Sequence, residues 1–214
     1  MIEISHLVKK YGDHYAVKDL NVRIEEGQIY GFLGPNGAGK STTMNMITGY
    51  LAPTAGTVKV DGFDIVKEPE KAKEHIGYLP EIPPLYMEMT VREYLEFAAE
   101  LKGIKKDKRE PQIEEVIRLA KLRAVENRLI QNLSKGYKQR VGLAGAMMGN
   151  PDILILDEPM NGLDQSGVDE MRGVLSSLAK GGTTIIMANH NAEDIELLCD
   201  TVCEMELGKL RMKS

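Results

Sequence analysis

The sequence lacks a net positive charge, a long apolar run and an N-terminal leader. Its 27 lysines and arginines are outnumbered by 32 aspartates and glutamates, so the formal net charge of −5 provides no basic field for holding nucleic acid. No run of about 18 apolar residues occurs that could cross a membrane. Residues Met1 to Ser5 have neither the basic nor the apolar region of a signal peptide. We therefore expect a cytosolic protein that does not itself cross a membrane and binds no nucleic acid.

Cysteine is also scarce, and the sequence has no internal repeat or low-complexity segment. The two cysteines, Cys199 and Cys203, stand four positions apart, at the expected end of a helix and start of a strand. A redox pair or half of a metal site is one interpretation. Because no histidine or further cysteine lies close by to complete such a site, we favour ordinary buried thiols. The length of 214 residues fits one sizeable domain.

A glycine-rich loop between an apolar run and a helix is the most informative stretch. Residues 34–41 read Gly-Pro-Asn-Gly-Ala-Gly-Lys-Ser and follow the apolar run Ile29 to Leu33. The three glycines let the backbone curl so that successive N–H groups point at an anion, and the next helix adds the positive end of its dipole. This pattern predicts a phosphate-binding loop, in which Lys40 reaches the outer phosphates and the Ser41 hydroxyl ligates Mg²⁺. The expected nucleotide-binding residues here are Gly34, Asn36, Gly37, Ala38, Gly39, Lys40, Ser41 and Thr42.

Two acidic residues follow a second apolar run. Ile153 to Leu156 is typical of a strand buried on both faces of a parallel sheet, and it leads directly into Asp157 and Glu158. Ligands of doubly wound folds lie at the carboxyl ends of the strands, so both acids should face the same crevice as the phosphate loop. Asp157 is suited to hold Mg²⁺ through its water shell, and Glu158 to take the proton from an attacking water. His190 follows another buried strand and is either a packed or solvated histidine or a member of this crevice.

The first part of the chain predicts antiparallel sheet. Apolar residues alternate with polar ones over residues 1–26, which indicates three short, half-buried strands. Residues 9–13 are expected to form a turn with Tyr11 at its tip. The Tyr11 ring would stack on a purine there, or else be an ordinary exposed turn residue. Further strands are expected at 56–62 and 75–79.

Two amphipathic helices are predicted after the proline-rich loop that begins at Pro80. Thr90 stands three residues before Glu93, the spacing of a capping box, and Gly103 ends the first helix. A second helix is expected to begin at Pro111. The charged residues 105–109 between them are interpreted as a solvated link.

A third helix is predicted to begin after Ser134. The serine is suited to cap it, and Gly149 to Pro151 close it. Its N-terminus would be a second site for an anion. Gly142 and Gly145 weaken an isolated helix by roughly 1 kcal/mol each, but they permit close approach of a neighbour.

The ordered set of motifs resembles the nucleotide-binding subunit of an ATP-binding cassette (ABC) transporter, over essentially the whole chain. In that family two subunits sandwich two ATP molecules head to tail. The positions that the resemblance assigns are Tyr11 as the adenine-stacking aromatic, residues 34–41 as the Walker A loop, Glu81 as the glutamine-loop position, residues 133–137 as the signature, Asp157 and Glu158 as the Walker B pair, residues 161–164 as the D-loop and His190 as the switch histidine.

The resemblance implies an ATP hydrolase with ATP and Mg²⁺ as ligands. Lys40, Glu158 and His190 would be catalytic, and Ser41, Asp157 and Glu81 would surround the metal. Tyr11, Ser134 and Gly136 would join the phosphate loop in binding nucleotide.

It also implies a single α/β domain over residues 1–214, with a P-loop NTPase (RecA-like) core and a mostly parallel sheet. The core and an N-terminal antiparallel β subdomain would comprise residues 1–83 and 149–214. A helical signature subdomain would comprise residues 84–148.

Two departures from the family pattern stand out. Glu81 replaces the usual glutamine, which places an acid where a neutral ligand is normal and would shift metal preference or slow turnover. The signature reads Leu-Ser-Lys-Gly-Tyr rather than Leu-Ser-Gly-Gly-Gln, so Lys135 and Tyr137 alter the surroundings of the retained Ser134 and Gly136. Such variants resemble the branch that serves ABC-2-type exporters, in which the ATPase is a separate polypeptide.

The partners implied by the resemblance are a second copy or a related subunit, joined on ATP binding, and an integral membrane permease. The permease would hold the chain at the inner face of the cell membrane. One rival is a soluble ABC-family ATPase of DNA repair or translation, which coiled-coil insertions or two fused cassettes would mark. A kinase or GTPase with the same loop is a second rival, but the guanine-reading pattern Asn-Lys-x-Asp is absent. The transported substrate and its direction are properties of the permease.

Overall fold

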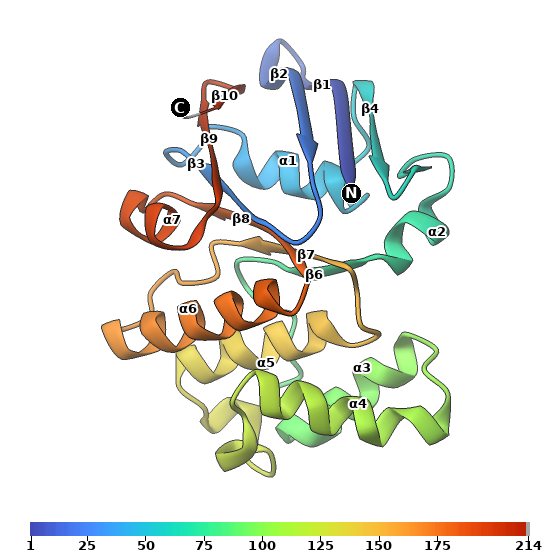
Figure 1. Cartoon of the computed structure of the whole chain (residues 1–214), viewed down its shortest axis with the longest axis vertical. Coiled ribbons are helices and arrows are strands. Elements are labelled where there is room, and N and C mark those ends of the chain that lie inside the picture. Colours follow the sequence, from blue (N-terminus) through green and yellow to red (C-terminus); the bar gives the residue numbers. More distant parts are fainter. Residues whose placement is uncertain (213–214) are drawn as a thin grey trace.

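The computed structural model describes residues 1–212, and its strands form two sheets (Figure 1). The smaller sheet is antiparallel, with the order β2-β1-β4-β5. It contains β1 (Ile2–Tyr11), β2 (His14–Ile24), β4 (Ala55–Val60) and β5 (Phe63–Asp64). The larger sheet has the order β10-β9-β3-β8-β7-β6 and is parallel except for the β9–β10 hairpin. It contains β3 (Ile29–Leu33), β6 (Ile76–Leu79), β7 (Ile153–Asp157), β8 (Thr184–Asn189), β9 (Thr201–Glu206) and β10 (Lys209–Met212).

Helices lie on both sides of the larger sheet. They are α1 (Lys40–Ile47), α2 (Pro69–Glu74), α3 (Val91–Leu101), α4 (Lys106–Leu119), α5 (Lys135–Met147), α6 (Gln165–Lys180) and α7 (Ala192–Leu198), with 3-10 turns at Arg123–Val125 and Ile130–Asn132. Figure 1 shows α1 between the two sheets, α5 and α6 on the opposite side of the larger sheet, and α3 and α4 beyond α5. The predicted α/β architecture, with an N-terminal antiparallel part and a helical part, is confirmed.

The central strands are buried on both faces, as the apolar run at 153–156 predicted. Leu154 and Leu156 of β7 pack into the core beneath α5 and α6, whereas Ile153 and Ile155 pack into the core around α1. Side chains alternate between the faces of a strand, so one strand joins two hydrophobic cores. Truncation of Ile155 to alanine would cost about 2–5 kcal/mol of stability, the usual range for a buried isoleucine. Both cores therefore hold the end of β7 that carries Asp157.

The N-terminal residues form two long strands, not the three short ones predicted. Strand β1 runs through to Tyr11, and only Gly12 and Asp13 form the turn. The register of β1 and β2 shifts at several points, and His6 and Asp19 adopt positive φ angles of 50° and 49°. Such β-bulges interrupt the apolar alternation without ending the strand. The prediction mistook bulges for strand ends, and Tyr11 is the last residue of a strand.

The second helix of the helical part begins earlier than Pro111. Helix α4 starts at Lys106 and carries Pro111 in its interior, so the supposed charged link is its first turn. Arg92 of α3 pairs with Glu110 at 2.8 Å, and Arg109 lies 3.6 Å from Glu100. These ion pairs tie the charged turn to α3, so the tertiary context overrides the usual effect of proline on a helix.

The other helix signals are confirmed. Thr90 and Glu93 form the capping box of α3, and the Ser134 hydroxyl accepts a hydrogen bond from the N–H of Tyr137 at the start of α5. A Cβ at Gly142 would lie 2.7 Å from Pro83, and one at Gly145 would lie 2.9 Å from the hydroxyl of Tyr94. The two glycines therefore do allow close approach to α5.

The two cysteines are unpaired, Cys203 buried and Cys199 partly buried. Both are free thiols, Cys199 at the end of α7 and Cys203 in β9. Burial raises the pKa of Cys199 to about 12 and that of Cys203 to about 11. The interpretation as ordinary thiols in the protein interior is confirmed. None of the helices within residues 1–212 has the length and hydropathy needed to span a bilayer.

Candidate nucleotide-binding site

Three neighbouring parallel strands bring the predicted segments to one edge of the larger sheet. The order β3-β8-β7 places the phosphate loop, His190 and Glu158 side by side, since each directly follows one of these strands. The N–H of Gly34 donates to the carbonyl of Asn189 at 3.4 Å, and that of Glu158 to the carbonyl of Ala188 at 2.9 Å. Residues far apart in the sequence thus share one crevice at the carboxyl ends of the strands, as expected for a doubly wound fold.

The phosphate loop leads into α1 through two residues in the left-handed region. Gly37 and Gly39 have φ angles of 80° and 108°, and a Cβ at Gly39 would lie 2.4 Å from the carbonyl oxygen of Ala16. No side chain caps α1. The first N–H groups of a helix have no partner within it, so those of α1 remain available to an anion.

Lys40 is buried at the first position of α1. Its ammonium donates to the carbonyl oxygens of Gly34 at 2.6 Å and Pro35 at 3.2 Å, and lies 3.4 Å from a carboxylate oxygen of Glu158. A phosphate would compete with these oxygens for the same donors. The loop thereby holds its only lysine at the mouth of the anion site.

Ser41 and Asp157 meet across the site. The Ser41 hydroxyl donates to Asp157 Oδ1 at 3.2 Å. Burial raises the pKa of Asp157 above its usual value; the hydrogen bond from Ser41 lowers it, and the carboxylates of Glu158 and Glu81 raise it further. Three carboxylates thus face a cleft that also has to accept the charge of a triphosphate. An all-oxygen set with excess negative charge fits a hard divalent cation such as Mg²⁺.

Glu158 lies between a lysine and a histidine. One carboxylate oxygen faces Lys40, and the other lies 2.8 Å from Nδ1 of His190. The backbone of Glu158 has a φ of 49°, a left-handed conformation that costs a non-glycine residue roughly 1 kcal/mol or more. Strain of this kind is retained where the surrounding structure determines the position of a side chain. Here it aims the carboxylate into the cleft.

The cleft has a volume of about 490 Å³ and gathers most of the predicted residues. Those that line it are Tyr11, Asn36, Gly37, Gly39, Lys40, Ser41, Thr42, Glu81, Glu158 and His190. Gly34, Ala38 and Asp157 are not among the lining residues, although Asp157 contacts Ser41, which is. Sequence reasoning did not assign His14, Ala16 or Asn161 to the cleft. His14 pairs with Tyr11 across the turn of a β-hairpin. The two-residue spacing of this hairpin could have indicated that His14 lies beside Tyr11 in the cleft.

Glu81 is held by an amide. Its carboxylate accepts a hydrogen bond from the side chain of Asn161 at 2.9 Å, and its carbonyl oxygen accepts one from Gln139 at 3.2 Å. Asn161 begins the loop that follows Glu158. This contact was absent from the sequence-based expectations, because two residues 80 positions apart show no pattern.

Ser134 and Gly136 lie outside the cleft. They line a separate pocket of about 400 Å³, together with Leu163 and Asp164. The structure therefore does not bring the N-terminus of α5 to the phosphate loop of the same chain.

Comparison with known proteins agrees with this geometry. Residues 17–161 match the family described as ABC transporter. The bacitracin transport ATP-binding protein BcrA of Bacillus licheniformis is 40% identical over 211 residues, which cover 98% of this chain and 68% of that protein. The chain belongs to the ABC transporter family. It is an ATP-binding subunit of this family and an ATP hydrolase, as expected.

Solved structures of other ABC cassettes share the whole fold. One is the cassette MJ0796 in a dimeric, post-hydrolysis state with ADP and Pi, with a TM-score of 0.89, 27% identity and coverage of 100% of this chain and 98% of that one. Another is cbiO1 from Clostridium perfringens, part of the ABC transporter complex cbiONQ, with a TM-score of 0.89, 31% identity and coverage of 98% and 86%. The predicted P-loop NTPase fold is confirmed for this ABC cassette. These relatives give no support to the rival role in DNA repair or translation.

Proposed function

We propose that two copies of the chain, or one copy and a related subunit, close on two ATP molecules. Each ATP would lie between the phosphate loop of one copy and the Ser134 end of α5 in the other. The observation that carries this proposal is the separation of the two anion sites within one chain, since Lys40 lines one pocket and Ser134 another. Because Ser134 does not line the cleft of its own chain, it could reach the γ-phosphate only in the cleft of a second copy.

Each residue of the cleft has its own role in ATP hydrolysis. Lys40 and the N–H groups at the start of α1 bind the phosphates, and Glu158 accepts the proton of the attacking water. His190, hydrogen-bonded to the second oxygen of Glu158, orients that carboxylate. Mg²⁺, held through Ser41 and Asp157, supplies neutralisation of the phosphate charge when bound. Tyr11, half-exposed at the rim of the cleft, stacks on the adenine ring.

Glu81 and Asn161 modify this site. The amide of Asn161 partly offsets the charge of a carboxylate that stands where the family usually has glutamine. Glu81 lines the cleft, and its Oε1 would have to give up the hydrogen bond from Asn161 before it could help to hold a metal ion. We propose that this competition slows turnover relative to a glutamine-bearing site.

The helical region, residues 84–148, receives the membrane subunit and moves relative to the core. Beside it, the loop after Pro80 exposes apolar side chains: Ile82 is 83% exposed, Tyr86 48% and Met87 40%. Exposed apolar side chains in one loop favour contact with another protein. We propose that a short cytoplasmic helix of a permease docks near residues 80–92. The chain would then lie at the inner face of the membrane and serve an ABC-2-type exporter.

A substitution at the proposed base tests the assembly. Glu158→Gln keeps the shape of the side chain but removes its basicity, so ATP hydrolysis should fall about 100-fold or more while ATP binding persists. Size-exclusion chromatography with ATP should then show a stable dimer. Glu115→Gln, at an exposed glutamate of α4, is the matched control and should leave both readouts unchanged. Unaltered hydrolysis in Glu158→Gln would exclude Glu158 as the base.

The same trapped dimer tests the membrane partner. When Glu158→Gln is purified from membranes with ATP, an integral membrane protein should accompany it in stoichiometric amounts. A trapped dimer that purifies alone would retain the ATPase assignment and contradict the transport assignment.

A further inference from the structure

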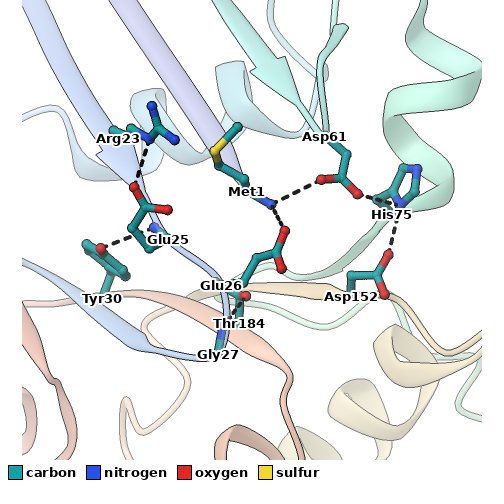
Figure 2. Close-up of polar contacts among 10 residues, drawn as sticks. All are labelled: Met1, Arg23, Glu25, Glu26, Gly27, Tyr30, Asp61, His75, Asp152 and Thr184. Carbon is teal, nitrogen blue, oxygen red and sulfur yellow. Dashed lines mark hydrogen bonds and ion pairs between the residues drawn. The ribbon is translucent and has the colours of Figure 1, made fainter.

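Three side chains of metal-binding type converge at the opposite edge of the larger sheet from the nucleotide cleft (Figure 2). Asp61 follows β4, His75 lies between α2 and β6, and Asp152 directly precedes β7. Nδ1 of His75 lies 2.8 Å from Asp152 Oδ2 and 3.4 Å from Asp61 Oδ2. The three candidate ligand atoms all lie within 4.8 Å of one another, the only such group within residues 1–212. We propose that Asp61, His75 and Asp152 bind a divalent first-row transition-metal ion, Zn²⁺ foremost.

The spacing of the ligand atoms fits such an ion. Zn²⁺ binds imidazole nitrogen and carboxylate oxygen at about 2.0–2.2 Å, so adjacent ligands of a tetrahedral site are roughly 3.3 Å apart. The two distances from His75 Nδ1, 2.8 Å and 3.4 Å, lie on either side of this value. The two carboxylate oxygens lie within 4.8 Å of each other, so a rotation of the aspartate side chains would bring all three ligand atoms onto one ion.

The backbone at all three positions is held by the sheets. The carbonyl of His75 accepts a hydrogen bond from Ile153 at 3.0 Å, and the carbonyl of Asp152 accepts one from Thr184 at 3.0 Å. The N–H of Asp61 donates to the carbonyl of Met1 at 2.9 Å. Ligands on such rigid positions lose little freedom when a metal binds, which favours affinity.

The orientation of the imidazole is also fixed. The ring of Phe63 stacks on that of His75, with centroids 6.1 Å apart and planes 15° from parallel. Figure 2 shows the imidazole of His75 between the carboxylates of Asp61 and Asp152. Nδ1 therefore points at the place where both carboxylates are within reach.

The surrounding charges favour a cation. The second oxygen of Asp61 forms an ion pair with the ammonium group of Met1 at 3.3 Å, and the carboxylate of Glu26 lies 3.4 Å from the same ammonium. Lys71 lies over the ring of Phe63 but is paired with Glu68 at 2.9 Å. The three carboxylates of Asp61, Asp152 and Glu26 outnumber the single ammonium of Met1, so a bound divalent ion would neutralise the remaining negative charge.

Solvent access and ligand chemistry define which ion fits. The side chain of Asp152 is 67% exposed and that of His75 28%, so an ion can enter from water and keep water as a further ligand. Mg²⁺ and Ca²⁺ prefer oxygen ligands alone, whereas one nitrogen and two oxygens suit Zn²⁺ and its neighbours in the first transition row. The site thereby differs from the all-oxygen set at Ser41 and Asp157.

An ion at this place would connect the two sheets. Asp61 directly follows β4 of the antiparallel sheet, whereas His75 and Asp152 directly precede β6 and β7 of the larger sheet. Asp152 and Asp157 are five positions apart along β7, a distance of about 17 Å along a strand, so the ion would not contact bound nucleotide. The bound ion would stabilise the packing of the antiparallel sheet against the larger sheet.

Calorimetric titration of ZnCl₂ into the nucleotide-free chain tests the site. We expect one site whose affinity falls at least tenfold in His75→Gln and in Asp152→Asn. His6→Gln is the matched control, because His6 also pairs with an aspartate, Asp19 at 2.7 Å, at a surface position without a second carboxylate. Saturating Zn²⁺ should raise the melting temperature of the parent chain by about 5 °C and leave that of Asp152→Asn unchanged. Millimolar MgCl₂ should not compete.

A second control separates the site from the nucleotide cleft, which also contains a histidine and carboxylates. His190→Gln should retain the Zn²⁺ affinity of the parent chain. Equal affinities in the parent chain, His75→Gln and Asp152→Asn would overturn the proposal, and so would loss of binding in His190→Gln alone. In that case the three side chains form only a histidine–carboxylate ion pair. Asp152 is exposed, so its substitution tests the site even where His75→Gln impairs folding.

Discussion

The N-termini of α1 and α5 are both anion sites by position, but they are built differently. Helix α1 follows a glycine loop and has no side-chain cap, and its lysine is buried against the carbonyl oxygens of Gly34 and Pro35. Helix α5 is capped by the Ser134 hydroxyl, at a distance of 3.4 Å from the N–H of Tyr137. The first site is embedded in a cleft, and the second opens into a pocket of its own.

This difference shows that donor geometry alone does not define a nucleotide site. At α1 the helix itself supplies a lysine and a serine, and the ends of two strands and the loops after them supply three carboxylates within one chain. At α5 the Ser134 hydroxyl accepts a hydrogen bond from the helix and can still donate its own proton to a phosphate, but its pocket contains no glycine-rich phosphate loop. In our proposal α1 therefore sets the affinity for ATP, and α5 sets the dependence of hydrolysis on a second copy.

The largest expected effect comes from removing the lysine of α1. Lys40→Ala should weaken ATP binding about 100-fold, because charge-assisted hydrogen bonds to two phosphates are lost. Lys135→Ala removes a lysine from the corresponding position of α5 and should leave the affinity of the single chain unchanged. Fluorescence titration with a labelled ATP analogue measures both. Equal losses in the two variants would erase the proposed distinction between the helices.

A smaller and more selective effect is expected at Ser134. Ser134→Ala should leave ATP affinity unchanged but lower the hydrolysis rate about tenfold, since it removes one donor to the γ-phosphate in the closed dimer. Loss of the cap also costs about 1 kcal/mol of stability.

Thr90→Ala separates these two consequences, because it removes the cap of α3 away from any nucleotide. Thermal melting should show similar destabilisation in both variants, and steady-state ATPase assays should show a loss in Ser134→Ala only. A matching loss of hydrolysis in Thr90→Ala would reduce Ser134 to a structural role.

The smallest effect is expected at the adenine end of the cleft. Tyr11→Ala should weaken ATP binding about tenfold, since stacking of a base on an aromatic ring contributes roughly 1–3 kcal/mol. Tyr15 is the control: it is exposed to a similar degree, 43% against 50%, and also carries a lysine over its ring, but it does not line the cleft. Equilibrium binding of ATP to both variants gives the answer. If the two variants have the same dissociation constant for ATP, Tyr11 has no stacking role and is an ordinary hairpin residue.

Much of the fold and of the cleft followed from local sequence. The phosphate loop, the buried strand before Asp157 and the caps at Thr90 and Ser134 depend on neighbouring residues, and all were located correctly. Their meeting at one edge followed from a general rule for parallel sheets. The roles assigned to these side chains stay predictions.

Features set by contacts between distant segments were beyond local reasoning. The bulges of β1 depend on pairing with β2, and the early start of α4 depends on ion pairs with α3. The hydrogen bond between Asn161 and Glu81 joins two loops, and the group at residues 61, 75 and 152 joins two sheets. None of these has a characteristic spacing along the chain, so each became visible only in three dimensions.

The short loop after Glu158 has a thermodynamic consequence. Asn161 lines the nucleotide cleft, while Leu163 and Asp164 line the pocket of Ser134, which would serve the other nucleotide of a dimer. When ATP at one site shifts this loop and so changes the affinity of the other site, ATP at the second site changes the affinity of the first by the same factor. The two ATP molecules of a closed pair would then bind cooperatively, through four residues and without direct contact between the ligands.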